Sequence, residues 1–497
     1  MITLDQLFQR DYGSARIGVF GCGCWFYWDQ FPGLKDRLIE HQTVFEDRLK
    51  AHGVNVISGG LVDSPRLAAE TGDRFKSQDI DFLICYMSTY AMSSAVLPVV
   101  QRARVPMMIA SLQPTRAMDY AQGTTFMQLE HDNQTSLPEI CNALARANIH
   151  LPGLVVGTLY DDDKAWKRIL DWCKVARVIA TVRNARMGVM GHVYEGMLDM
   201  NTDPTMFDAF FGLHCDHLEL DDLHACVDRV TALEVNHKLE EINALFDFPP
   251  PGADPIAGPA KPEDIEWAAR VACGLDKLIE SFDLTGLAYY YRGLSGNANE
   301  KLAASLSVGS SLLTGRGFPI AGELDIKNCL AMLILDRLEA GGSFAEIHPC
   351  DFEHDIVLVG HDGPHHIGVA QGRPVLRGLS IYHGKRGAGI GVEFQLKHGP
   401  VTIMGLTQTV NGRFKFVLAE GESLPGPIPP TGNTNTRCHF PPDVSTFIEN
   451  WSLASPTHHF ALGVGHIAHL IEDLARCWGI ECVNVTHPNY QRPQYIL

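Results

Sequence analysis

Short apolar runs alternate with amphipathic segments through the first third of the chain, and this alternation limits the fold more than any other feature. Each run is short enough to be one buried strand, and the segments between the runs have helical spacing. This order is typical of a parallel sheet joined by crossover helices, whose ligands usually lie beyond the carboxyl ends of the strands. We expect strands at residues 16–21, 54–58, 81–87, 105–111 and 154–159. One helix is expected at 34–52, and another between the third and fourth strands, through residue 102.

A second α/β unit is expected to begin near residues 178–191. The Pro/Gly-rich stretch 249–262 interrupts it, and we interpret that stretch as a surface loop or linker. After it we expect a helix at 263–282, a strand at 284–290 and a helix at 325–338.

From Ile356 onward, alternating strands with turn residues predict an antiparallel sheet or small barrel, with Asn411 and Gly412 as a hairpin turn. A helix at about 464–478 and a strand at 480–485 close the chain. The predicted fold class is therefore α/β. We expect two doubly wound, Rossmann-like α/β domains at residues 1–180 and 181–342, followed by a mainly antiparallel β domain with helices at 343–497.

The composition is that of a globular protein with a negative net charge, which repels polyanions. Among 497 residues, 45% are hydrophobic and 20% charged, and the formal net charge is −18. That charge disfavours nucleic acid and anionic membrane surfaces as partners. The amino terminus does not resemble a signal peptide, and no apolar stretch reaches the roughly 18 residues of a spanning helix. Thirteen scattered cysteines without a C-x-x-C pair indicate reduced thiols in a cytoplasmic protein.

The loop after the first predicted strand, GCGCWFYWDQF, differs from a dinucleotide-binding fingerprint. Bulky aromatic residues follow Gly21-Cys22-Gly23 where a third glycine would let the helix approach the strand. Nicotinamide binding is therefore disfavoured. The aromatic residues suit the apolar face of a sugar, a subunit contact or ordinary packing.

Carboxylates and imidazoles gather in four stretches of the carboxyl half. Glu323 stands in GFPIAGELD, Glu346 in GGSFAEIHPCDFEHD, His361 in VLVGHDGPHH, and His458 and His459 in SPTHHFALGVGH. Each alone has an ordinary interpretation, such as a helix-dipole contact or a hydrogen-bonded loop residue. Together, and without a thiolate pair, they favour a divalent ion such as Mn²⁺, with Mg²⁺, Co²⁺ or Zn²⁺ as alternatives.

The same stretches carry a resemblance to a known family. In order along the chain, GFPIAGELDIK, GGSFAEIHPCDFEHDIVLVGH, GPVTIMGLTQTVNGRFKF and THHFALGVGHIAHLIEDLARCWGIECVNV resemble the carboxyl half of the arabinose/fucose isomerase superfamily. LICYMSTYAMSSAVLPVVQRARVPMMIAS and LEHDNQTSLPEI in the amino-terminal third are similar to that family as well. The likeness covers most of the chain and is loosest between Met200 and Asp283.

The resemblance implies a Mn²⁺ site made of Glu323, Glu346, His361 and His459, with the two glutamates also serving as acid and base. His458 is then a neighbour that orients His459 or touches the substrate.

His466 is expected to be a helix residue without a chemical role. The spacing between Glu346 and His361 is about two residues shorter than in the arabinose enzymes. Asp351 is therefore an alternative metal ligand in this stretch.

The candidate substrate-binding residues are less specific. Gln134 matches a glutamine of the family's NQT segment, but the family's following histidine falls on Leu137. Trp25, Arg186 and His458 are further candidates. Packing, or a surface salt bridge for Arg186, is the alternative.

The resemblance implies an aldose–ketose isomerase that acts on a monosaccharide through a cis-enediol, with a specificity that differs from L-arabinose. It also implies a homo-oligomer, a trimer or hexamer, because in the family one subunit completes the site of another. Two other classes stay open: a sugar-binding or regulatory protein, and a metal-dependent hydrolase or lyase on the same scaffold.

Overall fold

The computed structural model describes residues 3–252, 254–291, 296–380 and 389–493, and the chain divides into two compact units. The sheet unit consists of Gly13–Thr181 and Leu470–Gly479, and the main unit of Met1–Tyr12, Val182–His469 and Ile480–Leu497. The division into domains at 1–180, 181–342 and 343–497 stays a prediction.

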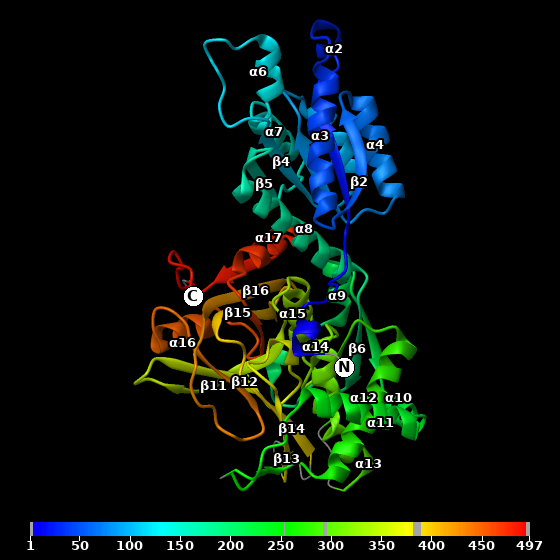
Figure 1. Cartoon of the computed structure of the whole chain (residues 1–497), viewed down its shortest axis with the longest axis vertical. Coiled ribbons are helices and arrows are strands. Elements are labelled where there is room, and N and C mark those ends of the chain that lie inside the picture. The colour runs from blue at the N-terminus through cyan, green and yellow to red at the C-terminus, as the bar shows by residue number, and fades with distance from the viewer. Residues whose placement is uncertain (1–2, 253, 292–295, 381–388, 494–497) are drawn as a thin grey trace. The chain divides into compact units, whose positions relative to one another are not determined.

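The sheet unit is built on five parallel strands in the order β2-β1-β3-β4-β5. These are β1 (Arg16–Cys22), β2 (Asn55–Val62), β3 (Phe82–Met87), β4 (Met107–Gln113) and β5 (Gly153–Thr158). All five strands were expected, with ends that differ by a few residues. Every residue of β3 is buried, as in parallel sheets covered on both faces. Helices α3 and α4 pack against β2 (Figure 1).

The helices of this unit begin where the sequence provides capping groups. Ser64 accepts a hydrogen bond from the Leu67 N–H at the start of α4, and Pro65 follows in the first turn. The helices are α2 (Tyr27–Gln30), α3 (Leu34–Ala51), α4 (Pro65–Ser77), η1 (Ser93–Ala95), α5 (Leu97–Ala103), α6 (Thr125–His131), α7 (Leu137–Arg146), α8 (Asp163–Arg183) and α17 (Ala468–Trp478).

The main unit contains a second parallel sheet, in the order β10-β9-β6-β7. Its strands are β6 (Arg186–Gly191), β7 (His214–Leu218), β9 (Gly286–Tyr290) and β10 (Ile320–Ala321). The second unit was expected to start near Val178, but α8 continues to Arg183 and the strand begins only at Arg186.

Gly191 ends β6 with φ +98°, and a Cβ there would lie 2.0 Å from the Tyr290 oxygen. Only glycine therefore allows this close approach of β6 to β9.

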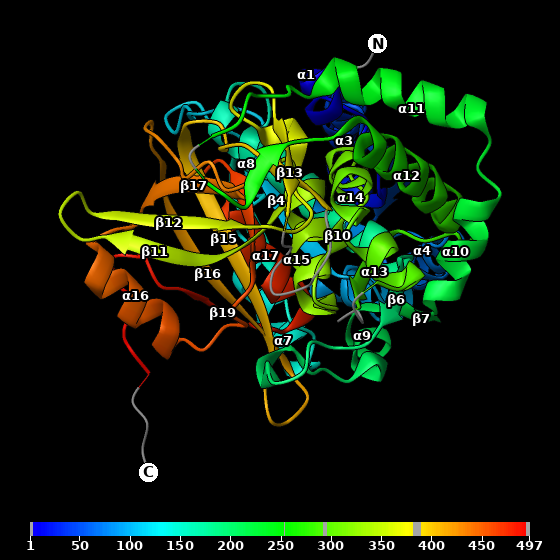
Figure 2. The same cartoon turned by 90° about the horizontal axis from the view of Figure 1, so that it is seen from below.

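The helices of this part of the chain differ in burial. They are α1 (Leu4–Phe8), η2 (Leu198–Met200), α9 (Pro204–Phe211), α10 (Leu220–Asp228), α11 (Ala232–Leu245), α12 (Pro262–Phe282), α13 (Ala298–Ala303), α14 (Leu306–Gly315) and α15 (Ile326–Arg337). Helices α11 and α12 run beside each other (Figure 2), whereas α14 and α15 are buried along almost their whole length.

The carboxyl-terminal part forms a closed barrel, one of the two forms expected. The pairing order β15-β18-β11-β12-β17-β16 returns to β15, and β19 adds to β16 in parallel. The strands are β11 (Ser343–Asp351), β12 (Ile356–His361), β15 (Gly399–Gln408), β16 (Phe414–Ser423), β17 (Thr434–His439), β18 (Phe460–Val464) and β19 (Glu481–Asn484). The hairpin turn at Asn411-Gly412 is confirmed, since the Thr409 N–H donates to the Arg413 oxygen across it. Figure 2 shows the β11–β12 hairpin beside α16 (Val444–Leu453).

A small sheet of β8 (Ala257–Pro259), β13 (Val375–Leu379) and β14 (Gly389–Glu393) lies outside the barrel, and η3 (Ile367–Val369) precedes it. The Pro/Gly-rich stretch is therefore not entirely a loop, because three of its residues pair with β13.

The helix expected at 464–478 was predicted too long. Phe460–Val464 is strand β18, paired with β11 and β15, and α17 begins only at Ala468. Short apolar runs do not distinguish a buried strand from a helix. His458 and His459 therefore precede a strand. His466 lies in the loop after it and contacts the Gly421 oxygen at 3.0 Å, so its expected place in a helix was wrong.

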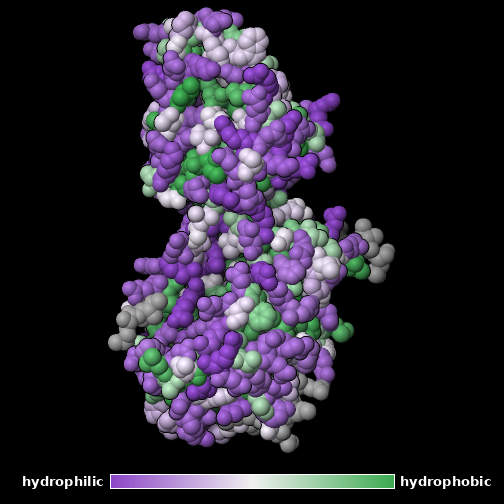
Figure 3. Space-filling view, turned by 90° about the vertical axis from the view of Figure 1, so that its right-hand side faces the viewer, coloured by the Kyte–Doolittle hydropathy of each residue, from purple (hydrophilic) through white to green (hydrophobic). Residues whose placement is uncertain are grey.

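The face of the molecule shown in Figure 3 is mostly hydrophilic, with apolar side chains in small groups. Among the described residues, no helix is both long and apolar enough to cross a membrane. All thirteen cysteines lie in the described ranges and are free thiols.

Candidate metal centre

Strand register brings three predicted site residues together. Glu346 lies on β11 opposite Gly360, the residue before His361 at the end of β12. On its other side β11 pairs with β18, where Ala345 lies opposite Phe460, the residue after His459. Because β11 lies between β12 and β18, Ala345 and Phe460 meet on neighbouring strands although they are 115 positions apart in sequence.

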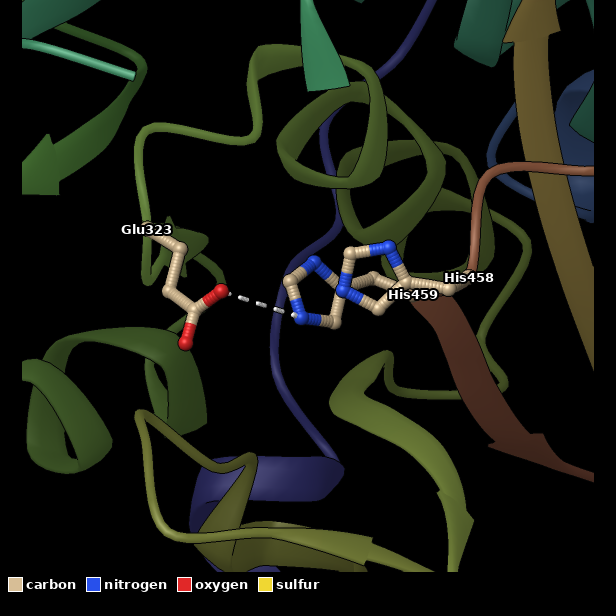
Figure 4. A group of neighbouring side chains, drawn as sticks. All are labelled: Glu323, His458 and His459. Carbon is tan, nitrogen blue, oxygen red and sulfur yellow. Dashed lines mark ion pairs between the residues drawn. The ribbon is translucent and has the colours of Figure 1, made fainter. Parts of the chain in front are cut away.

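Glu323 reaches the same place from the loop after β10. His459 Nε2 lies 3.7 Å from Glu323 Oε2, and His361 Nε2 lies 3.9 Å from Glu346 Oε1. Two overlapping groups have ligand atoms within 4.8 Å of one another: Glu346, His361 and His459, and Glu323, His458 and His459. In Figure 4, Glu323 points toward the two histidines from the opposite side. The four predicted ligands thus lie in one cluster.

The backbone that carries Glu323 is unusual. Glu323 and Leu324 both have positive φ, at 56° and 60°. The loop after β6 and the strand β9 hold this turn, since the Tyr194 N–H donates to the Glu323 oxygen and the Leu324 N–H to the Tyr289 oxygen. Non-glycine residues persist in this region only when their surroundings hold them there, often at functional sites.

Each of the two predicted histidine ligands has a carboxylate at Nδ1. Asp325 Oδ2 lies 3.1 Å from Nδ1 of His459, and Asp362 Oδ1 lies 2.8 Å from Nδ1 of His361. The Gly363 N–H also lies 3.1 Å from the His361 Nδ1, but the carboxylate is nearer and charged, so it favours a proton on that nitrogen. Both rings then turn their Nε2 lone pairs toward the glutamates, as in carboxylate–histidine–metal arrangements.

The two glutamates have opposite pKa shifts. Burial raises the pKa of Glu323. Burial would also raise the pKa of Glu346, but a hydrogen bond from His348 and the charges of His361 and His459 lower it to about 2. Two carboxylates whose environments separate their pKa values can divide acid and base roles.

The imidazoles differ as well. Burial lowers the pKa of His459 to about 4, which keeps its ring neutral and available as a ligand. Burial also lowers the pKa of His361, but the hydrogen bond and charge of Asp362 outweigh it and raise the pKa above its ordinary value. Binding of a cation at His361 would therefore compete with a proton.

Three buried polar atoms support a cation between these side chains. Within the described part of the chain, Glu323 Oε2, His458 Nε2 and His459 Nε2 have no hydrogen-bond partner. Each such atom costs about 1–3 kcal/mol unless something else satisfies it. Carboxylate and imidazole donors without a thiolate fit the Mn²⁺, Mg²⁺, Co²⁺ and Zn²⁺ class. The residues present thus fit a divalent cation.

A cavity of about 160 Å³ opens beside the cluster. Glu323, Glu346 and His361 line it on one side, and Tyr194, Tyr289 and Tyr290 contribute aromatic walls. The sequence reasoning missed these tyrosines, because aromatic residues at a strand end read equally well as core.

The remaining predicted residues lie elsewhere. Arg186 is the first residue of β6 and pairs with Asp216 at 2.9 Å. It lies at the amino end of the sheet, whereas the cavity tyrosines lie at or just beyond the carboxyl ends of β6 and β9. Asp351 caps a turn and contacts His354 Nδ1 at 2.9 Å, and it is not in either ligand group.

Gln134 and Trp25 belong to the sheet unit. The Gln134 amide donates to the Ser111 oxygen at 3.4 Å, and Trp25 is 58% exposed beside Phe26. Their contact with a substrate stays a prediction.

Comparison with known proteins gives a consistent result. Residues 341–481 match the family model of the L-arabinose isomerase C-terminal domain. The chain is 24% identical over 472 residues to the L-arabinose isomerase of Nocardioides sp., covering 91% of each chain. It is 23% identical over 410 residues to the enzyme of that name from Bacillus subtilis, with 81% of this chain and 80% of the relative covered. The L-arabinose isomerase of Geobacillus thermodenitrificans is 25% identical over 337 residues, or 66% of each.

Proposed function

The chain belongs to the L-arabinose isomerase-like family, and from this premise we propose that it is a metal-dependent aldose–ketose isomerase. It interconverts an open-chain aldose and ketose through a cis-enediol. The observation that carries the proposal is the cluster of two glutamates with opposite pKa shifts and two carboxylate-paired histidines beside a cavity.

Glu323, Glu346, His361 and His459 would hold the ion, with Mn²⁺ as the expected metal and Mg²⁺, Co²⁺ or Zn²⁺ as alternatives. When bound, the cation polarises the substrate carbonyl and stabilises negative charge on the adjacent oxygens. Asp325 and Asp362 keep the two imidazoles oriented for this role.

The glutamates divide the proton transfers. Glu323 is the stronger base because burial raises its pKa, so we assign to it the proton that leaves C2 and returns to C1. Glu346 is ionised at rest, with His348 at 3.4 Å, and accepts the proton from one substrate oxygen only until it returns it to the other.

Substrate contacts follow from the same cavity. The tyrosine walls exclude water and suit the apolar faces of a sugar. His458, which is grouped with Glu323 and His459, is a further candidate contact. Gln134 and Trp25 remain candidates if a homo-oligomer, a trimer or hexamer, brings them to the cavity of another subunit. The ion pair of Arg186 with Asp216 argues against a substrate role for Arg186. The departures at Leu137 and Trp25 support a specificity that differs from L-arabinose.

The test is incubation of the Mn²⁺-loaded protein with a panel of aldoses in deuterated water. We expect one aldose to give a ketose with deuterium at C1, EDTA to abolish the reaction, and Mn²⁺ to restore it. E323Q is the matched variant and should form no ketose. Absence of ketose with every aldose would contradict the proposal. Tight sugar binding without turnover would then identify a sugar-binding protein, and a change of product mass a hydrolase or lyase.

A further inference from the structure

His458 is held at two points by one residue from a distant part of the chain. Asp199 Oδ2 accepts hydrogen bonds from the His458 backbone N–H at 2.9 Å and from ring Nδ1 at 2.7 Å. Asp199 belongs to η2, in the segment 192–203 that connects β6 to α9, and lies 259 positions before His458. The ring can therefore neither swing nor flip without breaking a contact to this segment.

The position of the carboxylate decides which nitrogen of His458 faces the site. A carboxylate at Nδ1 favours a proton there, and it leaves the lone pair on Nε2. That Nε2 is buried, has no hydrogen-bond partner among the described residues, and belongs to the ligand group with Glu323 and His459. Asp199 thus fixes the tautomer and orientation of His458 in the same way as Asp325 fixes those of His459.

A buried lysine holds the segment that carries Asp199. Lys327 is fully buried, and its ammonium donates to the Met200 oxygen at 2.9 Å and to the Asn201 oxygen at 3.5 Å. Burial lowers the pKa of Lys327, while the nearby charges of Asp325 and Asp199 raise it. A buried ammonium group is costly unless it is paired. The hydrogen bonds of Lys327 to these two carbonyl oxygens therefore hold the segment in a defined position.

The residues that follow are fastened to the barrel. The Thr202 hydroxyl and the Asp203 N–H both donate to Gln408 Oε1 at 3.0 Å. The four residues directly after Asp199 are therefore all held by contacts to other elements.

We propose that Asp199 and Lys327 are positioning residues for His458, with Asp199 selecting its tautomer and aim and Lys327 fixing the segment that carries Asp199. The inference rests on the proposed function in one respect, that His458 touches the substrate. One short stretch then organises the centre: Glu323 enters the cluster, Asp325 orients His459, and Lys327 secures the orientation of His458.

The first test needs no turnover. Histidine-selective ¹⁵N NMR of the metal-free full-length protein at pH 8.5 reports the tautomer of His458, whose signal is the one lost in H458Q. We expect Nδ1–H in the wild type and a mixture in D199N, because the Asn amide can donate or accept at Nδ1. The control is D203N, which changes a helix-capping aspartate of the same segment and should leave the tautomer unchanged. Nε2–H in the wild type, or an unchanged tautomer in D199N, would overturn the proposal.

The lysine is tested by hydrogen exchange. K327M should raise exchange of the amides at residues 198–203 and give the same tautomer mixture as D199N. Unchanged exchange and tautomer in a folded K327M would remove Lys327 from the proposal. If K327M does not fold, the D199N result still decides the role of Asp199, since exposed pairs like Asp199–His458 contribute only about 0–1 kcal/mol.

A double-mutant cycle separates positioning from a merely structural role. We expect D199N to lower kcat about 10–100-fold, the range seen when the partner of a functional histidine is removed. Once His458 is replaced by glutamine, D199N should have little further effect. Additive losses would contradict the proposal. If the wild type forms no ketose at all, the proposed function fails while the tautomer test still stands.

Discussion

Two buried histidines show how the sheet unit differs from the metal centre. His41, on α3 of the sheet unit, uses both ring nitrogens: Nδ1 contacts the Tyr160 hydroxyl at 2.9 Å and Nε2 contacts Glu130 Oε1 at 3.0 Å. His459 uses only Nδ1, and among the described residues its Nε2 has no hydrogen-bond partner. Buried polar groups are normally paired. Burial alone therefore does not identify a ligand-binding imidazole, and neither does an unpaired nitrogen, since the buried His366 Nδ1 also has no partner among the described residues but His366 lies in neither ligand group. What distinguishes His459 is an unpaired nitrogen that faces a carboxylate, Glu323, at 3.7 Å.

The same contrast occurs within the main unit. His365 is fully buried four residues after His361, and both of its nitrogens are paired, with Ser343 Oγ at 3.1 Å and with the His361 oxygen at 2.9 Å. Its role is to support the strand end that carries His361. His365 is therefore a structural histidine, whereas the unpaired Nε2 of His459 faces Glu323.

The largest effect is expected from removing the unpaired histidine. H459A should weaken Mn²⁺ binding by at least about 100-fold, because even loss of a ligand's hydrogen-bond partner typically costs 10–100-fold. Titration calorimetry on the metal-free protein measures this. H41A is the matched control and should bind Mn²⁺ with wild-type affinity. Equal affinity in H459A and H41A would break the comparison.

The next largest effect concerns the carboxylate behind His459. D325N should weaken Mn²⁺ binding about 10–100-fold, since the amide no longer fixes the Nδ1–H form. Asp336 offers a control on the same helix, α15, because it is also buried and contacts His366, a histidine outside both ligand groups. D336N should keep the wild-type affinity. A loss of similar size in D336N would mean that α15 responds to any change of buried charge.

Stability gives a second comparison. H41A removes two hydrogen bonds, to the hydroxyl of the exposed Tyr160 and to the partly buried Glu130, and should lower the free energy of unfolding by about 1–3 kcal/mol. In metal-free protein H459A should cost at least as much, because it leaves the fully buried carboxylate of Asp325 without its imidazole partner. Urea unfolding of both variants in EDTA measures the difference. A smaller loss in H459A than in H41A would contradict the pairing of His459 with Asp325.

The smallest effect is a pH dependence at His365. Burial lowers the pKa of His365 to about 3, below the ordinary value of 6.5, so the unfolded chain takes up a proton that the folded chain refuses. The stability is complete above pH 6.5 and is lost as the pH falls toward 3. Between pH 7 and pH 6 the loss is about 0.7 kcal/mol. H365N should lack this part of the slope, and an unchanged slope in H365N would place the titration elsewhere.

Much of the sheet unit could be predicted from sequence because its strands are continuous apolar runs between helical segments. The strand FALGV before His466 was not predicted, since a short apolar run does not distinguish a buried strand from a buried helix turn. Its strand identity depends on pairing with β11 and β15, which lie far away in sequence.

The predicted ligands were found by resemblance, and the residues that orient them were found only in the structure. Asp325 stands two positions after Glu323, so a carboxylate beside a ligand was a usable signal that we did not apply. Asp199 had no such signal, because its contact with His458 spans 259 positions and the segment that carries it has no recognisable motif. Long-range pairing of this kind is determined by topology rather than by local pattern.

The central claim is that Glu323, Glu346, His361 and His459 share one cation. A crystal structure of the Mn²⁺-loaded protein, with anomalous scattering to locate the metal, tests it most directly. The account predicts an anomalous peak within coordination distance of all four side chains. Mn²⁺ bound only to other side chains, or no peak at this cluster in saturating Mn²⁺, would contradict it.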